Sequence, residues 1–356
     1  MYYAYSQISE YTLMNWIFKV LIQNAAALLP ACISNSAYYW MQRHFGGLRP
    51  VKIDPSDHLN AGLEICDVIR KNGGMVEGKT FLEIGTGRRL NMPIVFWLSG
   101  AGKIITLDKN EYLKEELVLE DIKRMTDGES SPTDKHRLTQ IDKEQEISKE
   151  DSRKVGFSPE ANINHPSSSA FICGQSSSSS LPLLSQCRSL SDVMKTANIQ
   201  YVPNADAADL SGVGSFGYHV SLNVFEHIPS DVLTAILKKG AKNMNEGGLF
   251  VHIIDMTDHF SHSDKSLSSI NFLKYSDKNW NLIAGNRYMY QNRLRVDDYE
   301  TLFKEAGLEI VDIKKTIDEN ALAVLSNGLM VDEKYSGKPS EVLATTRIVV
   351  VARIQR

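Results

Sequence analysis

The chain has 356 residues, of which 42% are hydrophobic and 23% charged, and its formal net charge is −4. This composition is typical of a globular protein with a sizeable core. Charges of both signs are mixed along the chain without a basic run, which argues against electrostatic capture of DNA or RNA. The four cysteines (Cys32, Cys66, Cys173 and Cys187) form no CxxC pair, so we expect reduced thiols in a cytoplasmic protein and no zinc site.

The first 75 residues are predicted to form a helical extension. Residues 13–33 are fairly apolar, but Lys19 and two amide side chains interrupt them. A membrane-spanning helix needs about 20 nearly uninterrupted apolar residues, and a signal peptide needs a basic start, which residues 1–10 lack. We therefore predict amphipathic helices that pack on the main domain or cap its active site. Contact with a membrane surface is the less favoured alternative.

Strands and helices begin to alternate at about residue 79. Short apolar runs predict strands and helical spacing predicts helices: strands at 80–84 and 103–107, helices at 90–98 and 111–125. Such alternation is typical of a parallel sheet with helices on both faces.

Residues 127–195 interrupt this alternation. They are rich in Ser, Asp, Glu and Lys and contain an unbroken serine run at 176–180. Their apolar residues are too few to offset the entropy of ordering the chain. We predict a mostly disordered insertion within a main domain of residues 76–356.

The alternation resumes after the insertion. The predicted elements are strands at 199–202, 218–222, 249–254, 308–314 and 346–354 and helices at 230–244 and 296–306. The last strand is expected to be antiparallel to its predecessor, because no helix is evident between them. The predicted fold is thus α/β: a doubly wound, mostly parallel, seven-stranded Rossmann-like sheet with an antiparallel last strand.

The turn after the first predicted strand has the sequence Glu-Ile-Gly-Thr-Gly at residues 83–87. Its glycines allow a tight turn and close approach of a ligand to the backbone, at the edge of the sheet towards which the next helix points its amides. A dinucleotide-binding loop needs a third glycine at the position of Leu90, which disfavours an NAD-dependent dehydrogenase. Asp108, after the second predicted strand, can accept hydrogen bonds from both hydroxyls of a ribose.

The E-x-G-x-G turn followed by an acidic residue resembles class I S-adenosylmethionine-dependent methyltransferases. Residues 204–210 resemble the loop of that family that meets adenine, and residues 221–228, which end in Glu-His-Ile, resemble its fourth-strand motif. Gly247-Gly248 resembles the turn before its fifth strand. The likeness covers about residues 79–125 and 199–355.

The resemblance implies S-adenosylmethionine as the cofactor and assigns a set of residues to it. Gly85 and Gly87 would contact its amino-acid part, with Glu83 supporting the loop. Asp108 would bind the ribose, and Asn223 would face the cofactor. The adenine position falls on Asp206, with Asp209 as the runner-up.

Reactive and recognition side chains follow the fifth predicted strand, at an edge where doubly wound folds bind substrates. They are His252, Asp255, Asp258, His259, His262 and Asp264, then Trp280, Asn286, Arg287, Tyr288, Tyr290, Asn292, Arg293 and Arg295. The mixture suits a polyhydroxylated or carboxylated substrate. Asp-His-Phe followed by Asn-Arg-Leu-Arg also loosely resembles methyltransferases of bacterial polysaccharide and sugar clusters.

A hydroxyl acceptor must lose its proton, and a histidine with a near-neutral pKa suits that task. His259 is the first candidate, with Asp258 to orient it or to accept the proton in its place. His262 and His227 are alternatives. Asp258, His259 and His262 could instead ligate a divalent ion, but hydrogen-bonding roles are more usual for such clusters, and we expect no metal.

The sequence thus favours an O-methyltransferase that acts on a small molecule or a glycan precursor. The alternatives are an N- or C-methyltransferase of a small metabolite and a non-catalytic module that binds S-adenosylmethionine. No nucleic-acid partner is expected.

Overall fold

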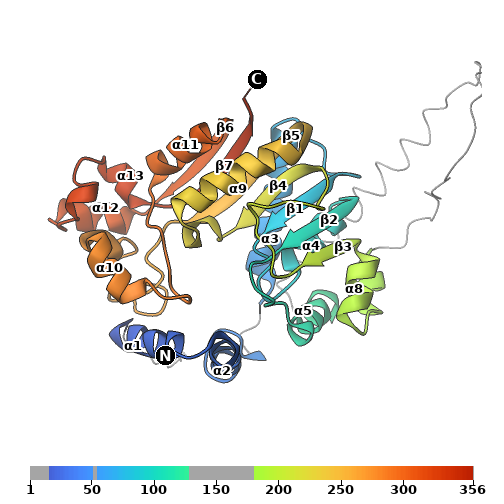
Figure 1. Cartoon of the computed structure of the whole chain (residues 1–356), viewed down its shortest axis with the longest axis horizontal. Coiled ribbons are helices and arrows are strands. Elements are labelled where there is room, and N and C mark those ends of the chain that lie inside the picture. Colours follow the sequence, from blue (N-terminus) through green and yellow to red (C-terminus); the bar gives the residue numbers. More distant parts are fainter. Residues whose placement is uncertain (1–15, 51–53, 128–179, 356) are drawn as a thin grey trace, which may run out of the picture. The chain divides into compact units, whose positions relative to one another are not determined.

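The computed structural model describes residues 16–50, 54–127 and 180–355, which contain a seven-stranded mixed sheet with flanking helices (Figure 1). The strand order is β3-β2-β1-β4-β5-β7-β6, and β7 is antiparallel to both of its neighbours. The predicted fold class is confirmed. The strands are β1 (Thr80–Ile84), β2 (Lys103–Leu107), β3 (Ile199–Val202), β4 (Phe216–Leu222), β5 (Met244–Asp255), β6 (Leu308–Ile317) and β7 (Thr345–Ile354).

The helices of the described residues are numbered as in Figure 1. The α-helices are α1 (Trp16–Ala27), α2 (Ala31–His44), α3 (Ser56–Lys71), α4 (Asn91–Leu98), α5 (Glu115–Asp127), α7 (Ser180–Ser185), α8 (Leu190–Thr196), α9 (Ser230–Asn243), α10 (Asp277–Ala284), α11 (Val296–Glu305), α12 (Glu319–Ser326) and α13 (Ser340–Ala344). The 3-10 helices are η2 (Phe225–His227), η3 (Asn271–Lys274) and η4 (Glu333–Tyr335).

The described residues within Ile53–Val220 and Asn243–Leu249 form one compact unit, the β1 unit. In it β1 pairs in parallel with β2 and β4, and β2 pairs in parallel with β3. Phe81 and Leu82 are neighbours in β1 and both are fully buried. Because successive strand residues point to opposite faces, both faces of β1 must be covered. The ring of Phe81 stacks on Phe96 of α4 with centroids 4.6 Å apart.

The described residues within Met1–Lys52, Ser221–Lys242 and Phe250–Arg356 form the second compact unit, the β6 unit. Here β7 pairs with β5 and β6, and α11 packs beside β6 and β7. Helices α12 and α13 lie between β6 and β7 in sequence. The antiparallel pairing is therefore as predicted, but the expectation that no helix lies between these two strands is wrong. Both helices are too short, at eight and five residues, to show a clear period in the sequence.

Two short helices, α7 and α8, lie at the end of the predicted disordered insertion. Helix α8 begins with a capping box, in which the Ser189 hydroxyl accepts the Asp192 amide at 3.1 Å and the Asp192 carboxylate accepts the Ser189 amide at 3.0 Å. Leu184 and Val193 are fully buried. A good cap and two buried apolar side chains thus order a segment whose average composition predicts disorder. Residues 128–179 of the insertion lie outside the described residues.

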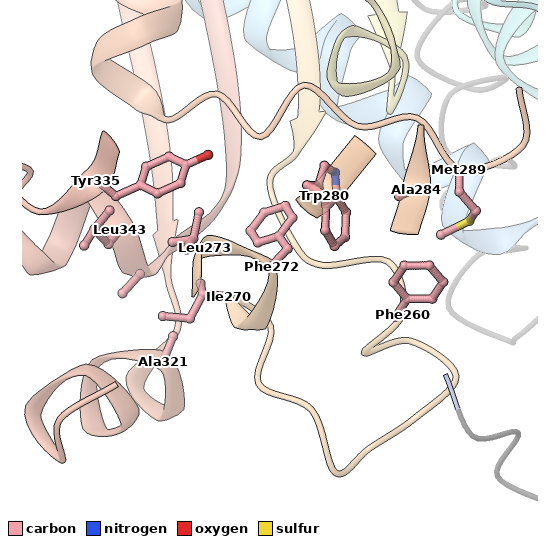
Figure 2. Close-up of a cluster of buried hydrophobic side chains, with 11 residues drawn as sticks. Phe260, Ile270, Phe272, Leu273, Trp280, Ala284, Met289, Ala321, Tyr335 and Leu343 are labelled. Carbon is pink, nitrogen blue, oxygen red and sulfur yellow. The ribbon is translucent and has the colours of Figure 1, made fainter. Parts of the chain in front are cut away.

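A cluster of buried apolar side chains forms the core around α10 in the β6 unit (Figure 2). Trp280 meets Phe260 and Phe272 edge to face, with centroids 6.0 and 5.7 Å apart. Helix α10 is capped by Ser276, whose hydroxyl accepts the Asn279 amide at 3.3 Å. The stretch between β5 and α11, for which the sequence pattern predicts no helix or strand, is therefore a packed structure with its own helix.

The N-terminal helices α1 and α2 belong to the β6 unit and contact its segment from Asp264 to Tyr288. The division into an extension of residues 1–75 and a main domain stays a prediction. The Asp264 carboxylate accepts the backbone amide of Trp16, the first residue of α1, at 3.2 Å. Arg287 donates to the carbonyl of Ala27 at 2.8 Å, and the ring of Tyr288 stacks on Tyr38 of α2 at 4.5 Å. Whether these helices cap an active site stays a prediction. Within the described residues, no helix combines the length and the apolarity that a membrane span requires.

Candidate functional site

The glycine-rich turn after β1 is held against the end of β2. Gly85 and Gly87 have φ angles of +87° and +68°, in the region that favours glycine. The amide of Gly85 donates to the carbonyl of Leu107 at 2.8 Å, and the amide of Gly87 donates to Oδ2 of Asp108 at 2.8 Å. A Cβ atom added to Gly87 would meet no atom within 4 Å. The turn therefore leaves bare backbone beside a carboxylate, with room for a ligand.

Asp108 is the central side chain beside this turn. Its Oδ1 accepts the amide of Asn110 at 2.9 Å, and its backbone carbonyl accepts the amide of Ala205 at 2.9 Å. Burial raises the pKa of Asp108, and the amides of Asn110 and Gly87 oppose that rise. Each carboxylate oxygen keeps a lone pair for a further donor. The residues thus fit a ribose whose two hydroxyls donate to Asp108.

The loop with the residues predicted to bind adenine is joined to Asp108 by the hydrogen bond from the Ala205 amide. Asp206 is exposed and its carboxylate accepts the amide of Ala208 at 2.9 Å, which shapes the loop. Asp209 instead bonds to Ser211, at 2.5 Å to its hydroxyl. The adenine role of Asp206 stays a prediction, as does that of Asn223, which belongs to the β6 unit and has a φ angle of +52°.

Glu83 lies buried in β1 and reaches the turn through two hydroxyl groups. Its Oε2 accepts the hydroxyl of Thr106 at 2.5 Å. Because this uses the only proton of that hydroxyl, Thr86 must be the donor in its 2.5 Å contact with Thr106. Burial raises the pKa of Glu83 to about 8; the Thr106 hydrogen bond opposes this rise and the Asp108 carboxylate adds to it.

We expect the buried Glu83 carboxyl to make stability fall as the pH rises. Its pKa is about 8 in the fold and near the ordinary 4.5 in the unfolded chain, so its stabilising contribution is complete below about pH 4.5 and is lost as the pH approaches 8. In Glu83→Gln the side chain is always neutral and this loss should disappear. Thermal unfolding of both proteins at about pH 5 and about pH 9 measures the difference. An equal fall in both proteins would contradict a protonated Glu83.

The two arginines after the glycines have protein partners. Arg89 donates to the buried Asp121 carboxylate at 2.5 Å, so it is a structural residue. Arg88 lies over the ring of Tyr112 at 5.2 Å.

A group of acidic and imidazole side chains follows β5 in the β6 unit. Nε2 of His259 lies 3.4 Å from Oδ2 of Asp255, and Nε2 of His262 lies 3.7 Å from the same oxygen. The ring of His227, from η2, meets the His259 ring at 5.0 Å. His259, together with Thr257, holds the pKa of Asp255 at about 2 in spite of burial. The structure thus brings His259, His262 and His227 together as candidates.

The hydrogen bonds of the Asp258 side chain go to groups other than His259. Its carboxylate is buried and accepts the amide of Phe260 at 2.9 Å and the side-chain amide of Asn271 at 3.2 Å. The carboxylate that lies beside His259 is Asp255. These hydrogen bonds of Asp258 shape the loop that carries His259, and the catalytic role predicted for Asp258 from the sequence stays a prediction.

Hydrogen bonding fixes which nitrogen of His262 carries a proton. Thr257 donates its hydroxyl proton to Oδ1 of Asp255 at 2.6 Å. The contact of 2.8 Å between this hydroxyl and Nε2 of His262 must then have the histidine as donor. Nε2 of His262 therefore cannot accept a proton while this contact is made, and only Nδ1 of this ring can act as a base.

Several residues predicted to meet the substrate are structural. Arg295 is fully buried and donates to the carbonyls of Met256 and Leu343, each at 2.9 Å, and of Thr345. Arg293 donates to two other carbonyls and to Asp277. The spacing of guanidinium groups in a sequence cannot show that their donors are satisfied by the backbone.

Other residues that were predicted to meet the substrate also have hydrogen-bond partners within the protein. His252 is buried in β5 and its Nδ1 lies 2.8 Å from the Ser221 hydroxyl. Asn286 bonds to Asn24 of α1 at 2.9 Å, and Arg287 and Tyr288 hold the N-terminal helices as described. The mixture that suggests a polyhydroxylated substrate is largely an internal contact surface.

The residue that sequence reasoning missed is Glu226. It lies 3% exposed in η2, and neither carboxylate oxygen has a hydrogen-bond partner in the described structure. Burial and then the nearby Asp255 raise the pKa of Glu226 well above its ordinary value. The backbone amides of Glu226 and Asp255 lie close enough to lower this pKa in part, without an aligned hydrogen bond. Its place in a Glu-His pair after a strand was the signal available in the sequence.

Comparison with known proteins gives one family. A family model described as a methyltransferase domain matches residues 58–313. No curated protein matches the chain in sequence.

Similar solved structures are distant. A S-adenosylmethionine-dependent methyltransferase from Clostridium acetobutylicum is 11% identical with a TM-score of 0.40, and the match covers 91% of this chain and 100% of that one. Magnesium protoporphyrin IX methyltransferase from Synechocystis PCC 6803 is 11% identical with a TM-score of 0.41, with coverage of 94% and 99%. The family match spans more than half of the chain, including the glycine turn, Asp108 and the histidine group. The chain therefore belongs to the methyltransferase family and is a class I S-adenosylmethionine-dependent methyltransferase.

Proposed function

We propose that this enzyme methylates a hydroxyl oxygen of a small molecule, and that His259 is the residue through which that hydroxyl loses its proton. The observation that carries the proposal is the 3.4 Å contact between Nε2 of His259 and Oδ2 of Asp255. An imidazole beside a carboxylate is the usual arrangement for handling a proton near neutral pH.

The cofactor supplies an activated methyl group, so the protein has mainly to hold the acceptor in line with it. Asp108 and the glycine turn would hold the ribose and the amino-acid part of the cofactor. The glycine turn, Asp108 and the loop from Asp255 to His262 all follow carboxyl ends of strands, where doubly wound folds bind ligands. A hydroxyl is favoured over an amine because an imidazole and a carboxylate provide for the removal of a proton.

Replacement of Asp108 tests the cofactor half. In Asp108→Asn we expect the affinity for S-adenosylmethionine to fall about 10-fold to 100-fold, because hydrogen bonds to a charged group contribute about 1.5–3 kcal/mol. Isothermal titration calorimetry measures this affinity. The control is Asp231→Asn on α9, which should bind as the wild type does. Equal affinity in all three proteins would remove Asp108 from the cofactor site.

Transfer of labelled methyl groups tests the acceptor. The enzyme would be incubated with labelled S-adenosylmethionine and a panel of phenols, aliphatic alcohols, glycosides and amines of similar size. Transfer to hydroxyl compounds supports the proposal, and transfer to glycosides would extend it to glycan precursors. Transfer to amines alone would overturn the hydroxyl assignment. Tight cofactor binding without transfer to any acceptor, including a metabolite extract, would favour a non-catalytic binding module.

A further inference from the structure

Three potential metal ligands meet between η2 and the loop after β5. One ligand atom from each of Glu226, His227 and His259 lies within 4.8 Å of the other two. All three residues belong to the β6 unit. The set that the sequence suggested (Asp258, His259 and His262) shares only His259 with it.

Glu226 has buried polar atoms without partners. Its Oε1 and Oε2 make no hydrogen bond within the described residues. A buried polar group that lacks a partner costs free energy. Two such carboxylate oxygens, with imidazole nitrogens of His227 and His259 close by, indicate a cation that is bound there.

His227 is prepared to act as a ligand. Its Nδ1 lies 2.7 Å from the backbone carbonyl of Tyr290, which can only accept. Nδ1 therefore carries the proton, and Nε2 of the neutral ring has a free lone pair. A second-layer carbonyl that fixes the tautomer in this way is the common partner of a metal-binding histidine.

Two neighbouring residues, Gln291 and Asn292, hold the two chain segments that carry these ligands. The side-chain amide of Asn292 donates to the carbonyls of Phe225 and Ile228, at 2.7 and 2.9 Å, and holds η2. Gln291 donates to the carbonyl of Thr257 at 3.0 Å and holds the loop that carries His259. The ligands are thus fixed by packing from a common element, as a built site requires.

We propose that Glu226, His227 and His259 bind a divalent transition-metal ion, with Zn²⁺ as the best match. Imidazole nitrogens select transition metals over Mg²⁺ and Ca²⁺, which prefer oxygen ligands. Bonds of about 2.0–2.2 Å place the ligand atoms of a tetrahedral zinc ion roughly 3.4 Å apart. Small side-chain rotations bring atoms now within 4.8 Å to that spacing.

The role of the ion rests on the proposed function, whereas its binding does not. Three protein ligands leave a coordination position for an oxygen of the acceptor. A cation there lowers the pKa of the acceptor hydroxyl, whose proton passes to water. The new O–CH₃ bond forms as the S–CH₃ bond breaks, and the electron pair of that bond remains on sulfur. In this arrangement His259 acts on the acceptor proton through the ion that it holds.

The binding test uses the full-length protein after treatment with a chelator and dialysis. Titration with Co²⁺, whose visible absorption reports imidazole ligation, should show one saturable site, and Zn²⁺ should displace the Co²⁺. Glu226→Gln and His227→Gln should each weaken Zn²⁺ binding by more than about 100-fold, because loss of even an outer partner costs about 10-fold to 100-fold. Glu300→Gln and His44→Ala, which change exposed side chains elsewhere, are the matched controls.

Thermal unfolding of each variant without metal shows that it is folded. Added Zn²⁺ should raise the melting temperature of the wild type and of both controls but not that of Glu226→Gln. The proposal is overturned if the wild type shows no saturable Co²⁺ site, or if both ligand variants bind Zn²⁺ as it does. Saturable binding together with turnover that chelation leaves unchanged would keep the site and remove its role in transfer. Binding with no methyl transfer to any acceptor would instead count against the proposed function.

Discussion

Replacing Arg295 by methionine is expected to destabilise the protein by about 3–5 kcal/mol. The guanidinium group is fully buried, and its donors satisfy the carbonyls of Met256, Leu343 and Thr345. Methionine fills much of the same volume but leaves these acceptors without partners. Each carries a desolvation cost of about 1–3 kcal/mol. Urea unfolding followed by circular dichroism measures the loss as a lower midpoint.

The matched control is Arg353→Met on β7, where an exposed arginine bonds to Glu309 at 3.0 Å. Surface pairs of this kind contribute about 0–1 kcal/mol, so its midpoint should move little. Should Arg295→Met fail to fold, Arg295→Lys gives a second measurement, because it keeps the charge and loses most of the donors. Wild-type midpoints in both Arg295 variants would show that these hydrogen bonds contribute nothing.

Loss of His259 is expected to lower methyl transfer by about 10²-fold to 10⁴-fold, the usual contribution of a group that assists proton transfer. In His259→Ala neither direct acceptance of the proton nor binding of a cation by this side chain remains possible. The affinity for S-adenosylmethionine should change little, because Asp108 and the glycine turn are untouched. Turnover with saturating acceptor and calorimetry with the cofactor measure the two effects separately.

Asp258→Asn distinguishes the role assigned here to Asp258 from the one that the sequence suggested. The Asp258 carboxylate bonds to Phe260 and Asn271. The asparagine side chain should therefore lower the melting temperature clearly, while the turnover of the folded enzyme should change little. His44→Ala controls for the loss of a histidine as such. Unchanged turnover in His259→Ala would exclude His259 from the mechanism, and a loss in Asp258→Asn as large as in His259→Ala would restore Asp258 as its partner.

The sheet could be predicted because its signals are local. The apolar run Thr80–Ile84 and the glycines after it determine a buried strand and a turn within a few residues of sequence. The same holds for Asp108, whose distance along the chain from the glycines follows from a strand, a helix and a strand. Helix α8 could not be predicted, since its stability depends on Ser189 as a cap and on the burial of Val193.

For the side chains that follow β5, the sequence could predict only the region of the chain in which candidate residues lie. Asp255 and Asp258 are equivalent in sequence, since both are acidic and lie close to His259. The turns of the loop decide which carboxylate faces the ring, and the backbone amide of Phe260 captures Asp258. Likewise, nothing in the sequence shows that the guanidinium groups of Arg293 and Arg295 donate hydrogen bonds to backbone carbonyls. Chemical type identifies candidates, whereas hydrogen-bond partners determine which are available.

The hydrogen bonds that hold helix α1 on distant parts of the chain have a consequence for biosynthesis. Asp264 accepts the amide of Trp16 across 248 residues, and Asn286 reaches Asn24 across 262. During translation, α1 therefore emerges long before its partners exist. Its apolar side chains Trp16 and Val20 pack against the core cluster of the β6 unit, whose last member, Ala344, must leave the ribosome before that cluster is complete. We expect the nascent N-terminal helices to depend on chaperones, whereas the β1 unit contains all of its parallel strand pairs once residue 222 has emerged.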